Sequence, residues 1–463
     1  MSDRIEADSL GKVKIPKDRL WGAQTQRSLE NFKIGQDIMP IELIQALALI
    51  KECCARVNAK KGWLNNKKAQ WIKTASQEIQ KSLLNDHFPL SVWQTGSGTQ
   101  TNMNVNEVIA NRAIQLSKGR IGDKSIHPND DVNKSQSSND TVPSAMRIAL
   151  YLFAQQKLLP ALTLFEKSLK LKIKEFHSII KTGRTHLMDA VPLSLSQEFS
   201  AFQQQIASNK KRIEQKLQDL LWLPIGGTAV GTGLNTFPQF SEKVCELIRK
   251  KTGYNFKSAK NKFSEISNHD CLVELSGSLK TLAVSLTKIA NDIRLLSSGP
   301  RCGLGELILP ANEPGSSIMP GKVNPTQCEA LTMLCLQVIG QDLNASLGGA
   351  SGQLQLNAYK PLIFFNCIRS LRLLSDGLNN FREKALNGLK ANKEKIKQNL
   401  ENSLMLVTAL NPHIGYDKAS QVAKFAYKKN ITLKESAKKL GFLTEEEFDK
   451  FVQAKNMIKA NLK

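Results

Sequence analysis

NHDCLVELSGSLKTLAVSLTKIANDIRLLSS, residues 268–298 of this 463-residue chain, contains an unbroken helical repeat. Its apolar residues alternate steps of three and four, at Leu272, Leu275, Leu279, Leu282, Leu286, Ile289, Ile293 and Leu296. This spacing is a heptad seam of about four repeats, which is typical of a long helix packed against other helices. We predict one helix roughly 45 Å long, ended by Gly299–Pro300.

Four further stretches have helical spacing of apolar residues, at 158–176, 195–220, 326–347 and 361–398. Together with 268–298 they make five long segments, which are expected to form a helical bundle. Their apolar seams extend beyond what one small bundle can bury. We therefore predict a mainly α fold in which chains also pack on one another.

The predicted bundle occupies the middle one of three domains. Residues 1–138 are mixed, with clear helical spacing only in patches such as 41–57 and 71–84. Residues 139–398 carry the bundle. A shorter segment with a Lys/Glu-rich end follows, and it predicts a small C-terminal helical domain at 399–463. A chain of this length has room for two or three such domains.

The net charge is strongly positive, because 64 Lys and Arg residues exceed 41 Asp and Glu residues to give +23. The basic residues are scattered, and aromatic residues make up only 6% of the chain. We interpret the charge first as solvated helix faces and second as a field that steers an acidic substrate. Nucleic-acid binding ranks last, because no nucleic-acid motif accompanies the charge.

The eight cysteines form no Cys-x-x-Cys pair, so their spacing does not support a zinc or iron–sulfur site. A chain of this size does not need disulfides, and we predict reduced thiols. The first residues, MSDRIEADSLGKVKIP, lack the apolar core of a signal peptide. No uncharged apolar run approaches the length of a membrane span. We predict a cytoplasmic protein with no membrane partner.

Asn312–Glu329, NEPGSSIMPGKVNPTQCE, lies in a long connection between two predicted helices. From 299 to 325 this connection contains five Gly and five Pro, and such length is typical of a functional loop or of disorder. Disorder fits poorly because apolar residues recur in the connection. The connection contains two adjacent hydroxyls, Ser316 and Ser317, followed by a cation, Lys322, and a side-chain amide, Asn324. With Asn324–Pro325 as a helix N-cap and first helical residue, this combination suits a small anionic ligand.

Two polar stretches pack hydroxyl and amide side chains around turn residues: 94–107, QTGSGTQTNMNVNE, and 127–140, HPNDDVNKSQSSND. Each is either an Asn/Ser-rich turn or a set of hydrogen-bond donors for carboxylates. Considered alone, His186 in TGRTHLMDAVP is interpreted as a histidine in a turn. Considered alone, Glu329 is interpreted as an acidic residue that compensates a helix dipole. Gly226–Gly233, GGTAVGTG, matches neither a dinucleotide nor a Walker pattern and predicts a tight interhelical turn.

GSSIMPGKVNPTQCEA, at 315–330, resembles the signature loop of the fumarase/aspartase superfamily. The other stretches that resemble this superfamily are 96–107, 127–140, 183–198, 223–235, 298–306 and 410–420. The resemblance therefore covers essentially the whole chain. Gly321 before Lys322, followed by PTQCE, is similar to the class II fumarate hydratase family, whereas aspartases typically carry Ala before that Lys.

The resemblance implies a mainly α, three-domain fold whose five central helices form a twenty-helix core in a homotetramer. It implies reversible anti hydration of fumarate to L-malate, a step of the tricarboxylic acid cycle, with no metal and no other cofactor. Active sites in that family are built from three chains. The implied partners are the dicarboxylate substrate and other copies of the chain, and not nucleic acid or a membrane.

By the same resemblance, Ser316 is the catalytic base and Lys322 polarises a carboxylate. His186 pairs with Glu329 to orient the water that enters or leaves. The implied substrate-binding residues are Ser97, Gly98, Thr99, Ser137, Ser138, Asn139, Thr185, Ser317, Lys322, Val323 and Asn324. A secondary dicarboxylate site is implied at Lys124, His127, Pro128, Asn129 and Asp130. The family often has a basic pair before this site, whereas only Lys124 is basic among residues 123–126 here.

Two other hypotheses are weighed against the hydratase. A related lyase, such as an aspartate ammonia-lyase, would use the same scaffold, but the residues around Lys322 argue against it. A catalytically silent helical scaffold or a basic nucleic-acid binder is the third hypothesis. The intact set of site residues argues against that one: Ser316, Lys322, Asn324, His186 and Glu329.

Overall fold

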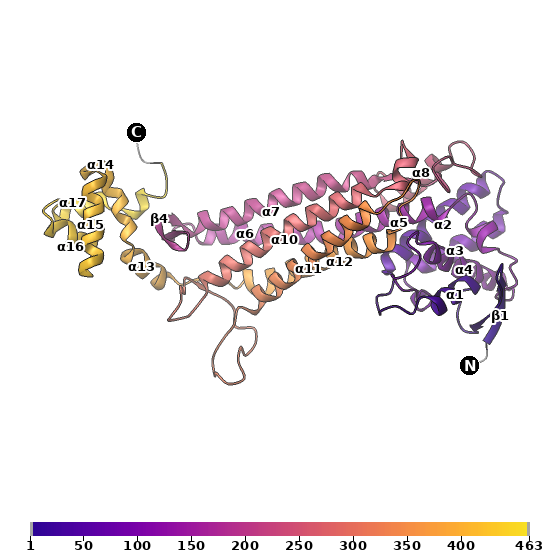
Figure 1. The fold of residues 1–463 in the computed structure, drawn as a ribbon, viewed down its shortest axis with the longest axis horizontal. Helices are drawn as coiled ribbons and strands as arrows, with labels where there is room; N and C mark the ends of the chain where they lie inside the picture. The colour runs from indigo at the N-terminus through magenta and orange to yellow at the C-terminus, as the bar shows by residue number, and fades with distance from the viewer. Residues whose placement is uncertain (1–2, 461–463) are drawn as a thin grey trace. The chain divides into compact units, whose positions relative to one another are not determined.

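The computed structural model describes residues 3–460 and divides into two compact units. Unit 1 is Met1–Pro160, Asn209–Ala283 and Cys335–Ser375, and unit 2 is Ala161–Ser208, Val284–Leu334 and Asp376–Lys463. The described residues contain seventeen α-helices and four two-stranded sheets (Figure 1). The predicted mainly α fold is therefore confirmed.

The N-terminal part of unit 1 is a group of helices packed around α2 (Ile41–Lys60). This helix lies against α3 (Asn66–Gln80), α4 (Thr99–Leu116) and α5 (Ser138–Phe153), as Figure 1 shows. Most of α2 is buried on all sides, which explains its apolar composition. The shorter elements here are β1 (Asp3–Asp8), β2 (Gly11–Pro16), α1 (Ala23–Asn31), η1 (Asn85–His87), η2 (Pro128–Val132) and η3 (Ala154–Leu158).

Five long helices occur at the predicted segments: α6 (Leu159–Glu175), α7 (Leu195–Leu217), α10 (Asp270–Leu296), α11 (Thr326–Ala350) and α12 (Lys360–Phe381). The eight residues of the predicted heptad seam on α10 are all buried, with at most 6% of any side chain exposed. The helix ends three residues before Gly299, as expected from the Gly-Pro pair. Helical periodicity therefore located all five bundle helices, although one predicted segment extends well past the end of its helix.

The prediction that residues 361–398 form a single helix is wrong. The elements that follow α12 are η5 (Arg382–Leu386), β8 (Lys390–Ala391) and α13 (Lys393–Asn402). β8 pairs antiparallel with β7 (Leu307–Ile308), which breaks the helix at a long-range contact. Gly388 marks the break, because a Cβ there would lie 2.6 Å from Pro310 Cγ.

The C-terminal helices share a hydrophobic core of their own within unit 2. It includes Leu410, Val422 and Ala437, which are all buried. The elements are η6 (Leu404–Leu410), α14 (Asn411–Ile414), α15 (Tyr416–Lys429), α16 (Leu433–Lys439), α17 (Glu445–Phe451) and η7 (Ala454–Asn456). This helical group lies where the small third domain was predicted, and the predicted boundaries at 138 and 398 stay a prediction.

The remaining elements connect the long helices. β3 (Ile180–Thr185) and β4 (Met188–Ser194) form an antiparallel hairpin between α6 and α7. The elements between α7 and α10 are η4 (Asp219–Leu221), β5 (Trp222–Leu223), α8 (Phe240–Thr252), β6 (Lys257–Ser258) and α9 (Lys262–Ser267). The Gly226–Gly233 segment lies here as irregular turns between helices, as predicted.

One helical run among the described residues, Ser138–Glu175, is long and apolar enough to cross a membrane by length and composition. Half of its most apolar window is buried inside the protein, and core helices of soluble proteins pass the same test. The run contains Pro160, two residues after the end of the π-turn η3. Because proline cannot donate the helical hydrogen bond, the wider turn accommodates the missing donor.

Candidate active site

Three hydroxyl groups at the N-termini of two helices lie together in unit 1. Thr99 Oγ1 is 2.8 Å from both Ser97 Oγ and Ser138 Oγ. Thr99 begins α4 and Ser138 begins α5, so these hydroxyls lie beside the first N–H groups of two helices. Asn139 donates from Nδ2 to the Ala229 carbonyl at 2.9 Å. Hydroxyls and positive helix ends together form a site that can bind a carboxylate.

Two glycines before α4 allow close packing that a larger residue would prevent. Gly98 is the N-cap of α4 with φ 75°, and a Cβ there would lie 2.9 Å from Val142 Cγ1. Gly96 packs directly on main chain, since a Cβ would lie 1.3 Å from the Ala358 carbonyl oxygen. The Gly96 carbonyl accepts a hydrogen bond from Lys360 N–H at 2.9 Å. The start of α12 therefore supports the loop that carries the hydroxyls.

Asp140 holds the α5 end of the site. It forms a capping box with Ser137, the N-cap of α5. Its second oxygen accepts hydrogen bonds from Gly226 N–H at 2.8 Å and from Thr228 N–H at 2.9 Å. Burial raises the pKa of Asp140 to about 6. The amides of this glycine-rich turn thus bind the chain's own carboxylate.

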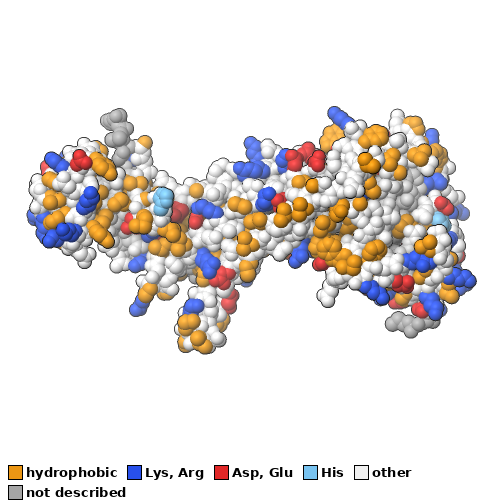
Figure 2. Space-filling view, viewed as in Figure 1, with side chains coloured by type: hydrophobic (Ala, Val, Ile, Leu, Met, Phe, Trp, Pro, Cys, Tyr) orange, Lys and Arg blue, Asp and Glu red, His pale blue; other side chains and the backbone are white. Residues whose placement is uncertain are grey.

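Ser316 lies near the tip of the loop between α10 and α11, in unit 2. Its Oγ accepts hydrogen bonds from Met319 N–H at 3.0 Å and from Ile318 N–H at 3.3 Å. Hydrogen bonds from amides stabilise negative charge on an oxygen. The tip is closed by a bond from Gly315 N–H to the Lys322 carbonyl at 2.9 Å. Figure 2 shows hydrophobic side chains at this projecting tip, where Ile318 is 82% exposed.

Asn324 was predicted to cap the helix after the loop, and that prediction is wrong. α11 begins at Thr326, directly after Pro325, and the Asn324 side chain donates to the Gly315 carbonyl. Asn324 therefore holds the loop tip together, and it is the Pro325 carbonyl that accepts from the helix start, with Glu329 N–H at 3.2 Å. The other predicted binding residues of the loop, all exposed, are Ser317, Lys322 and Val323.

His186 and Leu187 form the two-residue turn between β3 and β4, where Thr185 pairs with Met188. The turn position predicted for His186 is thus confirmed. Both turn residues have positive φ, 55° for His186 and 62° for Leu187. This conformation fits a type I′ hairpin. Histidine adopts it more readily than most residues, but it is unfavourable for a bulky residue such as Leu187. Strained backbone of this kind is typical of functional sites.

Glu329 lies in the first turn of α11, and its Oε1 is 3.3 Å from Arg294 Nη2 of α10. Within the described residues of one chain, His186 is not among its hydrogen-bond partners, so the implied His186–Glu329 pair stays a prediction. The predicted site residues thus form two groups. Those at 97–99 and 137–139 lie in unit 1, and those at 185–186 and 316–329 lie in unit 2.

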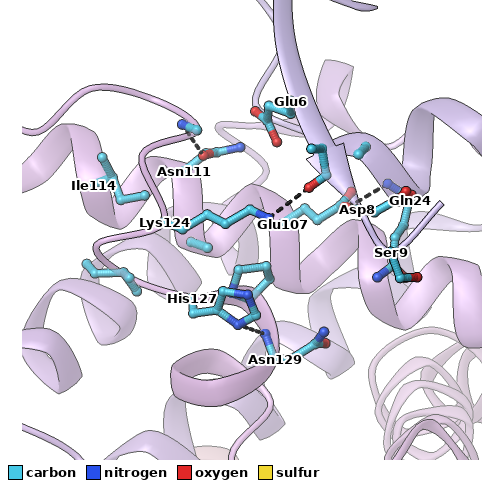
Figure 3. Close-up of a pocket in the computed structure, with 16 residues that line it drawn as sticks. Glu6, Asp8, Ser9, Gln24, Glu107, Asn111, Ile114, Lys124, His127 and Asn129 are labelled. Carbon is cyan, nitrogen blue, oxygen red and sulfur yellow. Dashed lines mark hydrogen bonds between the residues drawn. The ribbon is translucent and has the colours of Figure 1, made fainter. Parts of the chain in front are cut away.

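Four of the five residues of the implied secondary site, all except Asp130, line one cavity of about 320 Å³ in unit 1 (Figure 3). Lys124 Nζ donates to the Ala7 carbonyl at 2.8 Å, and His127 Nδ1 accepts from Asn129 N–H at 3.2 Å. Asp130 points outward, with 82% of its side chain exposed. The cavity is also lined by Pro128 and by three carboxylates, those of Glu6, Asp8 and Glu107. Lys124 is the only Lys or Arg among the described lining residues, so dicarboxylate binding there stays a prediction.

A buried lysine supports the unit 1 site and was missed in the sequence. Lys51 of α2 donates from Nζ to Asn133 Oδ1 at 2.7 Å, and Asn102 Nδ2 lies 3.2 Å from the same oxygen. Asn133 in turn donates to the Gln136 carbonyl, next to Ser137. Burial lowers the pKa of Lys51 to about 7. The available signal was a charged pair inside the apolar run ALALIKECCARV, residues 46–57.

Metal-ligating residues do not gather at these sites. In the part of the chain from 3 to 460, no group of three or more His, Cys, Asp or Glu side chains is arranged to hold a metal ion. The eight cysteines are free thiols, and burial raises the pKa of Cys245 to about 12, which leaves its thiol unreactive.

Comparison with protein families gives two matches that together span most of the chain. A family model described as Lyase matches residues 11–340, and one described as Fumarase C C-terminus matches residues 406–459. The chain is 57% identical to fumarate hydratase class II of Thermosynechococcus vestitus, with 98% of each chain covered. It is 52% identical to fumarate hydratase class II of Bacillus subtilis, with 99% of each covered.

Solved structures agree with these sequence matches. A class II fumarase from Schistosoma mansoni superposes with a TM-score of 0.96 at 45% identity, with 99% of each chain covered. A fumarate lyase:delta crystallin from Brucella melitensis, bound to cobalt, superposes with a TM-score of 0.95 at 42% identity, covering 99% of this chain and 100% of that one. The chain therefore belongs to the lyase family that contains the class II fumarate hydratases.

Proposed function

We propose that this protein is a hydro-lyase that interconverts fumarate and L-malate by reversible anti addition of water, as in the tricarboxylic acid cycle. The observation that carries this proposal is the identity of 57% to a class II fumarate hydratase over 98% of both chains. A likeness over both chains supports the proposal, because the proposed reaction uses residues from several separate segments of the chain.

Ser316 is the proposed base for the difficult step. Seen from L-malate, this step removes a weakly acidic C–H proton next to a carboxylate, and the charge of the resulting carbanion spreads onto that carboxylate. A serine hydroxyl with its ordinary pKa cannot take this proton at neutral pH, so the alkoxide must be stabilised. The N–H groups of Ile318 and Met319 already point at Ser316 Oγ, and Lys322 adds a positive charge on the same loop.

The substrate carboxylates are held by the groups at the helix N-termini. The hydroxyl chain of Ser97, Thr99 and Ser138 offers donors beside the ends of α4 and α5. Lys322 and Asn324 are proposed to polarise the carboxylate that receives the carbanion charge. The departing hydroxyl leaves as water once it has gained a proton. His186 and Glu329 are proposed to orient that water.

A homotetramer with composite active sites is part of this proposal. The supporting observation is a second heptad seam, on α11, that one chain leaves uncovered. Its large residues are exposed by 58% to 65%: Met333, Leu336, Leu343 and Leu347. They alternate with Gly340 in steps of three and four, the spacing of helices that pack against one another. In this proposal, residues of neighbouring chains that meet on this seam complete each active site.

The reaction needs no redox cofactor, because adding water changes the overall oxidation state of neither reactant. Proton transfer and charge stabilisation are supplied by the side chains and amides named above, so we propose catalysis without a metal. A cytoplasmic location is also a proposal. The similar proteins include a mitochondrial fumarate hydratase of Saccharomyces cerevisiae as well as bacterial enzymes, and cell fractionation would measure the compartment.

Purified protein incubated separately with L-malate and L-aspartate tests the activity, with fumarate followed by its ultraviolet absorbance. We expect rapid fumarate formation from L-malate and none from L-aspartate. Fumarate from L-aspartate alone would instead identify an ammonia-lyase on the same scaffold. Turnover of neither substrate by folded protein would favour a catalytically silent member of the family.

A further inference from the structure

A buried carboxylate, Glu306, lies at the base of the Ser316 loop in unit 2. Its side chain is completely buried. Glu306 Oε1 accepts hydrogen bonds from Arg184 Nη2 at 2.7 Å and from Asn399 Nδ2 at 3.1 Å. Glu306 Oε2 lies 3.2 Å from Lys181 Nζ. A fully buried carboxylate is costly unless it is paired in this way.

The two cations that bind Glu306 both belong to β3, the strand that leads to the His186 turn. Arg184 stands two residues before His186 and one before Thr185. Lys181 Nζ also donates to Glu198 of α7, at 2.9 Å and 3.1 Å to the two carboxylate oxygens. The two basic and two acidic side chains balance in charge, so a network of balanced charge centred on the buried Lys181 and Glu306 holds the hairpin.

The main chain of Glu306 is anchored as firmly as its side chain. Glu306 N–H donates to the Leu296 carbonyl at the end of α10, at 2.8 Å, and its carbonyl accepts from Asn392 N–H at 2.9 Å. The next residues, Leu307–Ile308, form β7, and the loop that carries Ser316 continues from there. Glu306 thus fixes the base of the Ser316 loop through its main chain. Through its side chain it binds β3, the strand that leads to His186.

We propose that Glu306 is a positioning residue that holds the His186 turn and the base of the Ser316 loop in one fixed arrangement. This inference rests on the proposed hydratase function. The turn needs such support, because His186 and Leu187 both adopt a left-handed backbone that persists only where the surroundings impose it. Displacement of a catalytic group by about 1 Å costs on the order of 10²-fold in rate, so loss of the network should reduce catalysis without contact to the substrate.

Glu306→Gln tests the proposal, because it keeps the shape of the side chain and removes its charge. We expect kcat for L-malate to fall by about 10-fold or more, by the same argument from misplacement. KM should change much less, because the proposed carboxylate-binding hydroxyls lie at the ends of α4 and α5. Glu306→Asp retains the charge and should recover part of the lost kcat.

Glu265→Gln is the matched control, because it removes the carboxylate that pairs with the buried Arg147 of unit 1. It is expected to lower the thermal midpoint and to leave kcat within about 2-fold, because this ion pair contacts neither the His186 hairpin nor the Ser316 loop. If Glu306→Gln does not fold, Asn399→Ala removes the neutral donor to Glu306, together with its longer bond to the Leu304 carbonyl, and keeps both cations. It should still lower kcat, by a smaller factor. A fall in kcat that tracks the thermal midpoint equally in all these variants would overturn the positioning role.

Amide hydrogen exchange supplies a readout that does not depend on activity. In Glu306→Gln, exchange should accelerate at 183–190 and at 309–325 together, and stay unchanged in the core of α15–α17. Wild-type protein that fails to turn over L-malate would overturn the proposed function and still leave this exchange result to be measured. Unchanged exchange in both segments, with kcat within 2-fold of wild type, would overturn the inference.

Discussion

Ser316 is the proposed catalytic base, and its side-chain oxygen accepts hydrogen bonds from the N–H groups of Ile318 and Met319. Ser316→Ala removes the proposed base and should lower kcat by about 10²–10⁴-fold, the usual contribution of a general acid–base group. Steady-state kinetics with L-malate measures this change. Ser317→Ala alters the adjacent exposed hydroxyl and should affect KM more than kcat. Near-normal kcat in folded Ser316→Ala would remove Ser316 from the role of base.

Asp140 makes a pH-dependent contribution to stability. Its pKa is raised from 3.8 to about 6 by burial, so the folded protein retains a proton that the unfolded chain has released between about pH 4 and pH 6. The contribution of this carboxyl is therefore full below about pH 4 and is lost as the pH rises through 6, by about 3 kcal/mol. Urea unfolding of wild type and Asp140→Asn at several pH values measures it.

Asp140→Asn should be less stable than wild type, because its amide has one acceptor oxygen. It cannot accept from Gly226 and Thr228 N–H at one position and from Ser137 N–H at the other. The stability gap between the two proteins should narrow as the pH rises from 4 to 6.5 and stay constant above that. A gap that widens with pH would show that hydrogen bonding, and not burial, controls this carboxyl.

At the scale of elements, the buried seam of α10 should dominate the stability of the bundle. Leu282 is completely buried in that seam, so Leu282→Ala should lower the free energy of unfolding by about 2–5 kcal/mol through lost contacts and a cavity. Leu83→Ala is the control at an apolar side chain that is 67% exposed, and its cost should stay near about 0.5 kcal/mol. Equal losses in chemical unfolding of the two variants would contradict this role of the seam.

At the scale of the whole molecule, the exposed seam of α11 predicts assembly. Leu343 is 60% exposed in one chain and lies among the seam residues, so Leu343→Lys would place a charge in the proposed interface. We expect dissociation in sedimentation or light scattering, and loss of malate turnover because the proposed active sites are composite. Lys428→Glu, on the exposed side of α15, should change the charge and leave both assembly and activity intact. An unchanged assembly in Leu343→Lys would exclude this seam as the interface.

Local patterns in the sequence predicted those features that depend on neighbouring residues. The α10 seam follows from steps of three and four, and the turn at His186 and the Gly226–Gly233 turn follow from breaker-rich composition. The resemblance of the Ser316 loop to a known signature led to the same family as the later comparisons. These features are encoded within a few residues of one another, so a single sequence is enough to show them.

Only the tertiary structure determined the features that depend on residues far apart in the chain. Helix 361–398 breaks because Gly388 packs on Pro310, and Asn324 holds a loop carbonyl instead of capping a helix. Asp140 binds amides 86 and 88 residues away, and Glu306 binds Arg184 across 122 residues. Helical periodicity cannot encode such pairs, because they form only when folding brings separate segments of the chain together. Each buried polar group then needs a hydrogen-bond partner, and that partner comes from a distant segment.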